Sequence, residues 1–444
     1  MQRSVALRER GQLAVLLNRI LHQARHSKQW SEPDARNLRT WRQLVLAVLV
    51  ARTTRLLGLA QALLPQRQAE TVKTLAIGLS SFLTKSKCPL ETLTPALLEA
   101  TLREVDPADI TRFRGKALLV LDPTEYPKRS RGTGKRKRHM QHIGRVRNAK
   151  GKASGTTTGY VDVWAGLVLK GKRFLPLARQ LFSSQHPDLV SQNQFEEAVL
   201  AAASAIAQRV GLETIVVADR GLGRKALLIQ LAKEQRMFVI RLDPDITAYH
   251  RTAPDGLELS QVLAQQPWLG EVTWDRGSRG KLRCRARVVR AEIRYSCSGR
   301  KADTTAAVMT FVELVPDHPK LDPLVLATTL PVGGRFDVQG IAHVYAQRWS
   351  IESAFETMKA WGLEAFMVRA WTAIERLLWL VALAYALATL VLYDGSSSGL
   401  RRQLERVLKA GGVVGRRLTV GKVAEGLGLD YRLHRRAWLR CWVG

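Results

Sequence analysis

The chain has few acidic residues and few cysteines for its length. Of 444 residues only 38 are Asp or Glu, against 69 Lys or Arg, which gives a net charge of +31. A charge of this size repels itself unless a polyanion neutralises it, and nucleic acid is the natural polyanion because each neutralised phosphate releases counterions. The four cysteines form no C-x-x-C pair. This excludes a zinc ribbon or finger and is ordinary for a reducing compartment.

Long apolar runs are also scarce. The longest uncharged one, LLWLVALAYALATLVLY at 377–393, has 17 residues, the short limit for a membrane span. A buried core helix is the favoured interpretation, and a membrane-associated basic protein is the alternative that fractionation without detergent would test. The first twenty residues carry scattered charges and no A-x-A-type cleavage site, so they predict an amphipathic helix and not a signal peptide.

Both ends of the chain are predicted to be helical. Apolar residues recur at 3.6-residue spacing through 42–64 and 70–83, so we expect a helical N-terminal domain over 1–112. Its basic character favours DNA binding, with a purely structural role as the alternative. After a flexible linker at GSSSG, 395–399, basic helices follow, and a helical C-terminal domain is expected over 373–444.

The middle of the chain predicts an α/β layer structure. Short apolar runs that read as strands alternate with helical patterns in the order β-β-β-α-β-α-β from 116 to about 243, with a hairpin at Lys170-Gly171-Lys172. Two of the strands end on a carboxylate, Asp122 and Asp219. Strand ends in such sheets are where ligands bind.

A β-rich insertion is predicted over 246–321. Within it, cations alternate with Leu282, Cys284 and Ala286 in the run KLRCRAR, which places the cations on one strand face. Arg283 and Arg285 are therefore candidate DNA-binding residues. The alternative is a solvated edge strand, since edges often carry charge.

The most informative pattern lies in YAQRWSIESAFETMK, which reads as one helix. Tyr345, Arg348, Glu352 and Lys359 fall within about 60° of one face at 100° per residue. The apolar residues cluster away from that arc. A carboxylate among two cations and a phenol suits an acidic substrate handled with a metal ion, whereas a solvated face of ion pairs is the plainer interpretation.

Three carboxylates stand out by position: Asp122, Asp219 and Glu352. Carboxylates are hard oxygen ligands suited to Mg²⁺ or Mn²⁺. Two such ions activate an attacking oxygen and stabilise the leaving one in phosphodiester transfer. Turn chemistry at Asp122-Pro123 and an ion-paired turn at Asp219-Arg220-Gly221 remain the structural alternatives.

With these residues in view, the chain resembles DDE transposases of bacterial insertion sequences, in particular insertion-sequence family four with its Y-R-E-K signature. Tyr345, Arg348, Glu352 and Lys359 match that signature at every spacing, and LLVLDPTEY and IVVADRG resemble the family's two Asp strands. The resemblance covers roughly 113–372. Some relatives have a base-capturing Trp at the position of Leu324.

The resemblance implies a ribonuclease-H-like catalytic core over 113–245 and 322–372, interrupted by the insertion domain. It also implies that Asp122, Asp219 and Glu352 are catalytic and hold two divalent ions. Tyr345, Arg348 and Lys359 would contact DNA. The implied reaction is cut-and-paste transposition through a DNA hairpin, acting on double-stranded element ends and target DNA. The resemblance also implies a homodimeric synaptic complex. The expected location is the bacterial cytoplasm, in association with the nucleoid and without a membrane partner.

A basic run directly follows the first predicted Asp strand. Residues 128–152 hold eleven Lys or Arg and no acid. The centre of the run, Lys135, Arg136, Lys137 and Arg138, is predicted to contact DNA phosphates, and a disordered linker is the alternative.

Two other functions compete with transposition. A nuclease or resolvase with the same core would hydrolyse DNA without joining it. A DNA-binding repressor with a decayed active site would do neither, although all three acids and all four signature residues are present.

Overall fold

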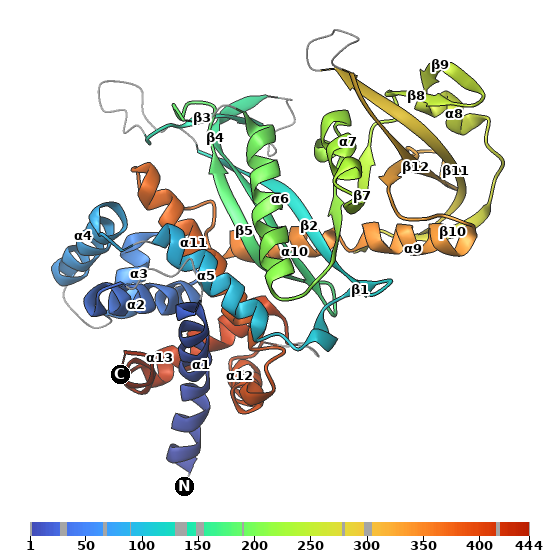
Figure 1. The fold of residues 1–444 in the computed structure, drawn as a ribbon. Helices are drawn as coiled ribbons and strands as arrows, with labels where there is room; N and C mark the ends of the chain where they lie inside the picture. Colours follow the sequence, from blue (N-terminus) through green and yellow to red (C-terminus); the bar gives the residue numbers. More distant parts are fainter. Residues whose placement is uncertain are drawn as a thin grey trace.

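The computed structural model describes residues 2–26, 33–64, 69–88, 90–128, 140–147, 155–188, 191–277, 280–296, 304–413 and 418–443. Helices from both ends of the chain lie together on one side of the molecule (Figure 1). The central strands follow, and the predicted insertion lies on the other side. The sheet runs through the centre and continues into the insertion.

The centre of the sheet is built from five strands in the order β5-β4-β2-β6-β7. Pairs β5–β4 and β4–β2 are antiparallel, whereas β2–β6 and β6–β7 are parallel. The bounds are β2 (Lys116–Pro127), β4 (Thr156–Leu169), β5 (Arg173–Phe182), β6 (Thr214–Ala218) and β7 (Met237–Leu242). The short strands β1 (Arg112–Phe113) and β3 (Gly144–Arg147) pair with β2 and β4. This mixed sheet confirms the predicted α/β class and is consistent with a DDE transposase domain.

The same sheet extends through antiparallel strands into the predicted insertion. Next to β7 come β13, β12, β11, β8 and β9, with β10 paired to β11. Their bounds are β8 (Thr247–His250), β9 (Ala253–Glu258), β10 (Gly270–Asp275), β11 (Lys281–Ser296), β12 (Thr304–Pro316) and β13 (Leu324–Thr328), with helix α8 (Leu259–Ala264) between β9 and β10. Residues 281–296 form the single long strand β11.

Helices from the middle of the chain pack on the sheet. Among them are α6 (Gln192–Arg209), α7 (Lys225–Lys233), α9 (Arg335–Ala346) and α10 (Trp349–Ala360). Helix α6 packs on β4 and β5, α7 packs on β11 and β12, and α10 packs on β5 and β2. In Figure 1, α6 crosses the front of the sheet and α10 passes behind it.

The remaining helices form one cluster around α11. Its members are α1 (Gln2–Arg25), α2 (Ala35–Ala51), α3 (Leu56–Leu63), α4 (Ala69–Lys85), α5 (Leu90–Arg103), α11 (Trp371–Leu390), α12 (Ser398–Ala410) and α13 (Val420–Val443). Helix α11 contacts α2, α4, α5, α13 and β5. It is long and apolar enough to cross a membrane, yet 94% of its apolar window is buried inside the protein, as expected of a core helix. Among the described residues, the bent pair α2 and α3 also passes that test if taken as one span.

Three predictions about elements need correction, and the edge-strand alternative for the KLRCRAR run is excluded. Asp122 does not end its strand, because β2 continues to Pro127. The signature helix is divided, since α9 ends at Ala346 and α10 begins at Trp349. The apolar run 42–64 breaks into α2 and α3, which meet at 99°. Strand β11 is not an edge strand, because it pairs with β10 and β12.

The predicted flexible linker at 395–399 is also structured. The Asp394 carboxylate accepts hydrogen bonds from the Ser396 hydroxyl at 2.5 Å and the Ser397 hydroxyl at 2.6 Å, and it caps a short 3-10 turn. Helix α12 then begins at Ser398. Serines satisfied by a capping carboxylate favour a turn over a disordered linker.

Candidate active site

Two parallel strands bring the first two acids together. Strands β2 and β6 pair in register up to Leu121 and Ala218. The next residue on each strand is therefore an aspartate, Asp122 on β2 and Asp219 just after β6. Both strands are apolar because both faces of the sheet are covered at this point, so the aspartates are the first polar groups beyond the paired region.

The third acid comes from α10. Glu352 lies in its first turn, and Arg348 is the residue just before that helix. Ile351, Ala354 and Phe355 of α10 are buried, so this apolar stripe fixes the helix against the sheet. The opposite stripe carries Glu352 toward the two aspartates, as the sequence pattern predicts.

The three carboxylates converge on the guanidinium of Arg348. Its Nη1 lies 2.5 Å from Glu352 Oε1, 3.8 Å from Asp219 Oδ2 and 3.9 Å from Asp122 Oδ2. The Arg348 side chain is 7% exposed, whereas those of Asp219 and Glu352 are about one-third exposed. The structure thus brings these four residues together, and it places the arginine among the acids.

The two aspartates differ in proton affinity. Burial raises the pKa of Asp122 to about 7, and the nearby carboxylates Asp219 and Glu352 act in the same direction against Arg348. Burial alone would also raise the pKa of Asp219, but Arg348, a backbone N–H and the Tyr345 hydroxyl lower it overall. Coupled carboxylates with pKa values pushed apart are typical of functional sites.

Two further side chains contact Asp219. The Tyr345 hydroxyl donates a hydrogen bond to Asp219 Oδ1 at 3.0 Å. Arg241 Nη1, from β7, lies 3.9 Å from the same oxygen. Arg241 was not among the site residues predicted from the sequence. The signal for it was the one cation in the apolar strand MFVIRL, next in order after the strand that leads to Asp219.

Lys359 lies farther along α10. Its Nζ pairs with Glu364 Oε1 at 2.8 Å, just beyond the end of the helix. Within the described residues Lys359 forms no ion pair with the three acids, although its charge acts to lower the pKa of Asp122. Of the four signature residues, three therefore meet at the acids, and the fourth lies beside them in an ion pair of its own.

A buried polar network supports β2 behind the acids. Asp162 on β4 and Arg179 on β5 form an ion pair at 2.6 Å that is almost fully buried. Asp162 also accepts hydrogen bonds from the Tyr126 hydroxyl at 2.8 Å and from Trp164 Nε1 at 2.7 Å. Trp164 is the register partner of Asp122, so the network fixes the strand position that carries the first acid.

A groove of about 1040 Å³ begins beside the acids. Its lining includes Pro123 and Gly221, close in sequence to the two aspartates, and the cations Lys359, Arg224 and Arg147. Two of the three lining carboxylates already pair with lining cations, Glu364 with Lys359 and Glu196 with Arg224.

The groove is lined by an edge of β2 that is poorly suited to pair with another β-strand. Beyond Leu121 no strand of the described residues pairs with the β6 side of β2, while β4 continues along its other side. Lys128 N donates to Thr158 O of β4, so by alternation residues 123, 125 and 127 turn their backbone away from β4 toward the groove. Pro123 and Pro127 have no N–H. Among residues 123, 125 and 127, only Glu125 therefore offers a backbone N–H donor to the groove. An edge of this kind suits a ligand other than a β-strand.

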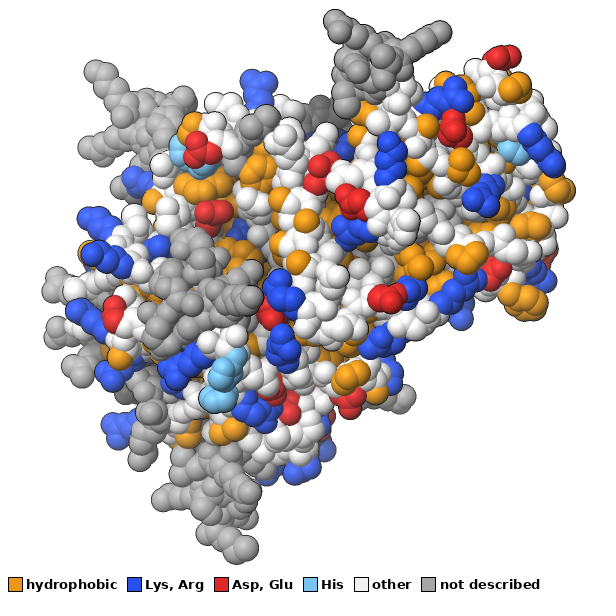
Figure 2. Space-filling model, in the orientation of Figure 1, with side chains coloured by type: hydrophobic (Ala, Val, Ile, Leu, Met, Phe, Trp, Pro, Cys, Tyr) orange, Lys and Arg blue, Asp and Glu red, His pale blue; other side chains and the backbone are white. Residues whose placement is uncertain are grey.

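Two other predicted DNA-binding residues, Arg283 and Arg285, are not part of the acid cluster. Arg283 pairs with Glu271 at 3.6 Å on the exposed face of β10 and β11, and Arg285 lies over the ring of Trp268 at 4.5 Å. Lys135, Arg136, Lys137 and Arg138 lie outside the described residues. Lys and Arg side chains are spread over the face shown in Figure 2, from the helical cluster to the insertion strands.

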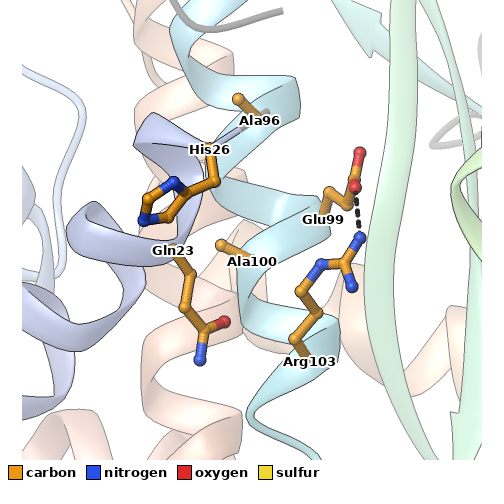
Figure 3. Close-up of a pocket in the computed structure, with 6 residues that line it drawn as sticks. All are labelled: Gln23, His26, Ala96, Glu99, Ala100 and Arg103. Atoms are coloured by element: carbon orange, nitrogen blue, oxygen red, sulfur yellow. Dashed lines mark hydrogen bonds and ion pairs between the residues drawn. The ribbon is translucent and has the colours of Figure 1, made fainter. Parts of the chain in front are cut away.

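A second hollow lies between α1 and α5 (Figure 3). It has a volume of about 320 Å³, and its lining includes Gln23, His26, Glu99 and Arg103, with Glu99 paired to Arg103. None of the predicted site residues lines it. Glu99 also pairs with Arg209 of α6, which indicates a role in joining the helical cluster to the sheet.

Comparison with known proteins points to the same region. Residues 188–387, a little less than half of the chain, match the family model of the transposase DDE domain. This match supports a DDE transposase. It spans Asp219, Arg348 and Glu352 and begins after Asp122. No match was found among curated proteins.

A transposase DDE domain implies DNA substrates and a nuclease or transposase activity, and such domains generally use divalent metals. The donor chemistry at the acids fits a hard divalent cation, because all three groups are carboxylates. The present arrangement of these three carboxylates does not suit a metal ion. Within the described residues no three Asp, Glu, His or Cys side chains are placed to hold a metal ion, since the acids are arranged around Arg348.

Proposed function

We propose that the chain is a cut-and-paste transposase similar to insertion-sequence family four. The observation that carries the proposal is the convergence of Asp122, Asp219 and Glu352 at the end of the β2–β6 pair. The strand order β5-β4-β2-β6-β7 supports a ribonuclease-H-like core over 113–245 and 322–372. The strands within 246–321 form the insertion domain of this proposal, and 1–112 and 373–444 form its helical flanking domains.

In this proposal Asp122, Asp219 and Glu352 are the catalytic residues and would hold two Mg²⁺ or Mn²⁺ ions. Those ions would supply activation of the attacking oxygen and stabilisation of the leaving one. The protein's own task is to present the carboxylates from rigid elements, and the register of β2 with β6 and the buried stripe of α10 supply that rigidity.

Tyr345, Arg348 and Lys359 would bind the DNA near the cleaved bond. Arginine grips a phosphate with two parallel hydrogen bonds, lysine offers a point charge and tyrosine one hydroxyl. The groove lined by Lys359, Arg224 and Arg147 would hold a strand that leaves the acids. A hairpin intermediate at the element end, a homodimeric synaptic complex and action on nucleoid DNA in a bacterial cytoplasm complete the proposal.

The direct test is cleavage by carboxamide variants. Asp122→Asn, Asp219→Asn and Glu352→Gln should each abolish cleavage in Mg²⁺ while DNA binding stays near wild type, because an amide is a poor metal ligand and phosphate contacts lie elsewhere. The matched control is Glu356→Gln, an exposed acid one turn farther along α10, which should cleave normally. The substrate is duplex DNA carrying both flanks of the gene. Near-normal cleavage by any of the three variants would remove that residue from the catalytic set.

A strand-joining assay separates this function from a nuclease or resolvase. Joined products support transposition, and hydrolysis alone supports the nuclease. On a denaturing gel, Arg348→Ala and Lys359→Ala should still produce the first nick but fail at the hairpin step, with Tyr345→Phe milder.

A further inference from the structure

The position of Arg348 among the acids has a consequence for metal binding. Its Nη1 is within 4 Å of a carboxylate oxygen from each of Asp122, Asp219 and Glu352. A divalent ion held by the same three carboxylates would have to share this space with a positive guanidinium. Two cations so close repel each other strongly at a buried site. The arginine and the metal therefore compete for the same carboxylates.

Arg348 is held at the acids mainly by charge. The one hydrogen bond that it donates to them goes to Glu352, and among the described residues its Nε is buried without a hydrogen-bond partner. The rings of Tyr345 and Trp349 lie 5.7 and 5.4 Å from the guanidinium carbon, which gives it apolar walls and no further acceptors. A guanidinium has five N–H donors in a fork that matches a phosphate. Most of that capacity is unused here.

We propose that Arg348 is the resident counter-ion of the acid cluster and that a DNA phosphate, by binding its guanidinium, opens the carboxylates to divalent metal. This rests on the proposed function, in which the acids are metal ligands and DNA is the substrate. Without DNA, the arginine keeps metal affinity low. With DNA, the guanidinium turns to the phosphate and the acids regain their full negative charge. DNA and metal then bind cooperatively, and by linkage the metal raises DNA affinity by the same factor.

The test measures Mn²⁺ binding to the full chain without DNA, from the EPR signal of the free ion. Arg348→Gln should bind Mn²⁺ about tenfold more tightly than wild type, within the usual range of coupling between sites. The matched control is Arg220→Gln, which removes one positive charge beside Asp219 from a side chain that instead pairs with Asp243. That variant should change the affinity far less. The double variant Arg348→Gln/Glu352→Gln should lose the gain.

Wild-type protein provides a second, independent measurement that needs no folded arginine variant. Its Mn²⁺ affinity should rise about tenfold when a short duplex of arbitrary sequence is present. Equal affinity with and without duplex, or equal affinity of wild type and a folded Arg348→Gln, overturns the proposal.

Failure of the proposed function would look different. If Asp122→Asn and Glu352→Gln bind Mn²⁺ as wild type does, with and without duplex, the acids are not the metal ligands at all. If they lose Mn²⁺ binding but Arg348→Gln matches wild type, the metal site stands and only the counter-ion role is wrong.

Discussion

At the scale of single residues, Lys128 is the most unusual cation of the described chain. Its Nζ donates to the carbonyl oxygens of Glu364 at 2.7 Å and Phe366 at 2.9 Å, and it lies 3.3 Å from the centre of the Phe366 ring. Burial lowers the pKa of Lys128 to about 7, with Glu364 acting in the opposite direction. This lysine ties the end of β2 to the segment after α10.

The lowered pKa gives a pH-dependent stability. Below pH 7 the lysine is charged in both folded and unfolded states, so the cost of burying that charge is fully present. As the pH rises from 7 toward 10.5, the folded state loses its proton first and the cost disappears. The stability of Lys128→Met relative to wild type should therefore be greater at pH 6 than at pH 9.5, by up to about 3 kcal/mol. Urea unfolding at the two pH values measures it, with exposed Lys409→Met as control. If the stability difference between Lys128→Met and wild type were the same at both pH values, the contacts with the carbonyls of Glu364 and Phe366 would be keeping Lys128 charged even at pH 9.5.

The buried pair Asp162–Arg179 gives a second prediction at this scale. Arg179→Met leaves the Asp162 carboxylate buried with only the neutral donors Tyr126 and Trp164. Removing one partner of a buried pair costs about 3–5 kcal/mol, so this variant should unfold at markedly lower urea. Adding Asp162→Asn should recover part of the loss. A single-variant cost below about 1 kcal/mol would show that water or a rearranged donor replaces the arginine.

At the scale of elements, hydrophobic pattern predicted the strands and helices that build the site. The runs ALLVL and TIVVA are apolar because both sheet faces are covered there. Gly211 lies just past the end of α6 and has a φ of +75°, a backbone conformation that favours glycine. The acids could be found because each one follows or interrupts an apolar pattern. Pattern also identified α11 as a core helix.

What pattern could not predict depends on long-range contacts. The break between α2 and α3 is fixed by Thr54, whose hydroxyl donates to the carbonyl of Gly362, more than three hundred residues away in the chain. The division of the signature helix at Gln347 leaves the residues in helical spacing, so periodicity shows no break. That Arg348 would lie among the acids also requires the three elements to be placed in space. The spacing of residues along the sequence shows that they share a helix face, but it does not give their distance from residues on other elements.

At the scale of the whole molecule, the two chain ends and the sheet are joined around one buried helix. Helix α11 lies among α2, α4, α5, α13 and β5, and Arg19 of α1 pairs with both Glu104 and Asp394. The apolar composition of α11 is thus explained by burial. The basic surface is a separate property of the molecule. A net charge of +31 attracts DNA to the protein as a whole. An experiment must therefore separate the effect of total charge from that of cations that contact the DNA directly.

The salt dependence of DNA binding separates the effect of total charge from that of local contact. Neutralising the basic run with Lys135→Gln, Arg136→Gln, Lys137→Gln and Arg138→Gln should flatten the dependence of duplex binding on salt. Each lost phosphate contact should change the slope of log binding constant against log salt concentration by about 0.9, because fewer counterions are released from the DNA. The control removes four exposed cations from the C-terminal helices instead: Arg402, Arg406, Lys409 and Arg432. Both variants carry the same net charge, so any general effect of charge is shared between them. If the run contacts DNA, only the first variant loses several units of slope. If both lose the same small amount, the run lies away from the DNA and acts through net charge alone.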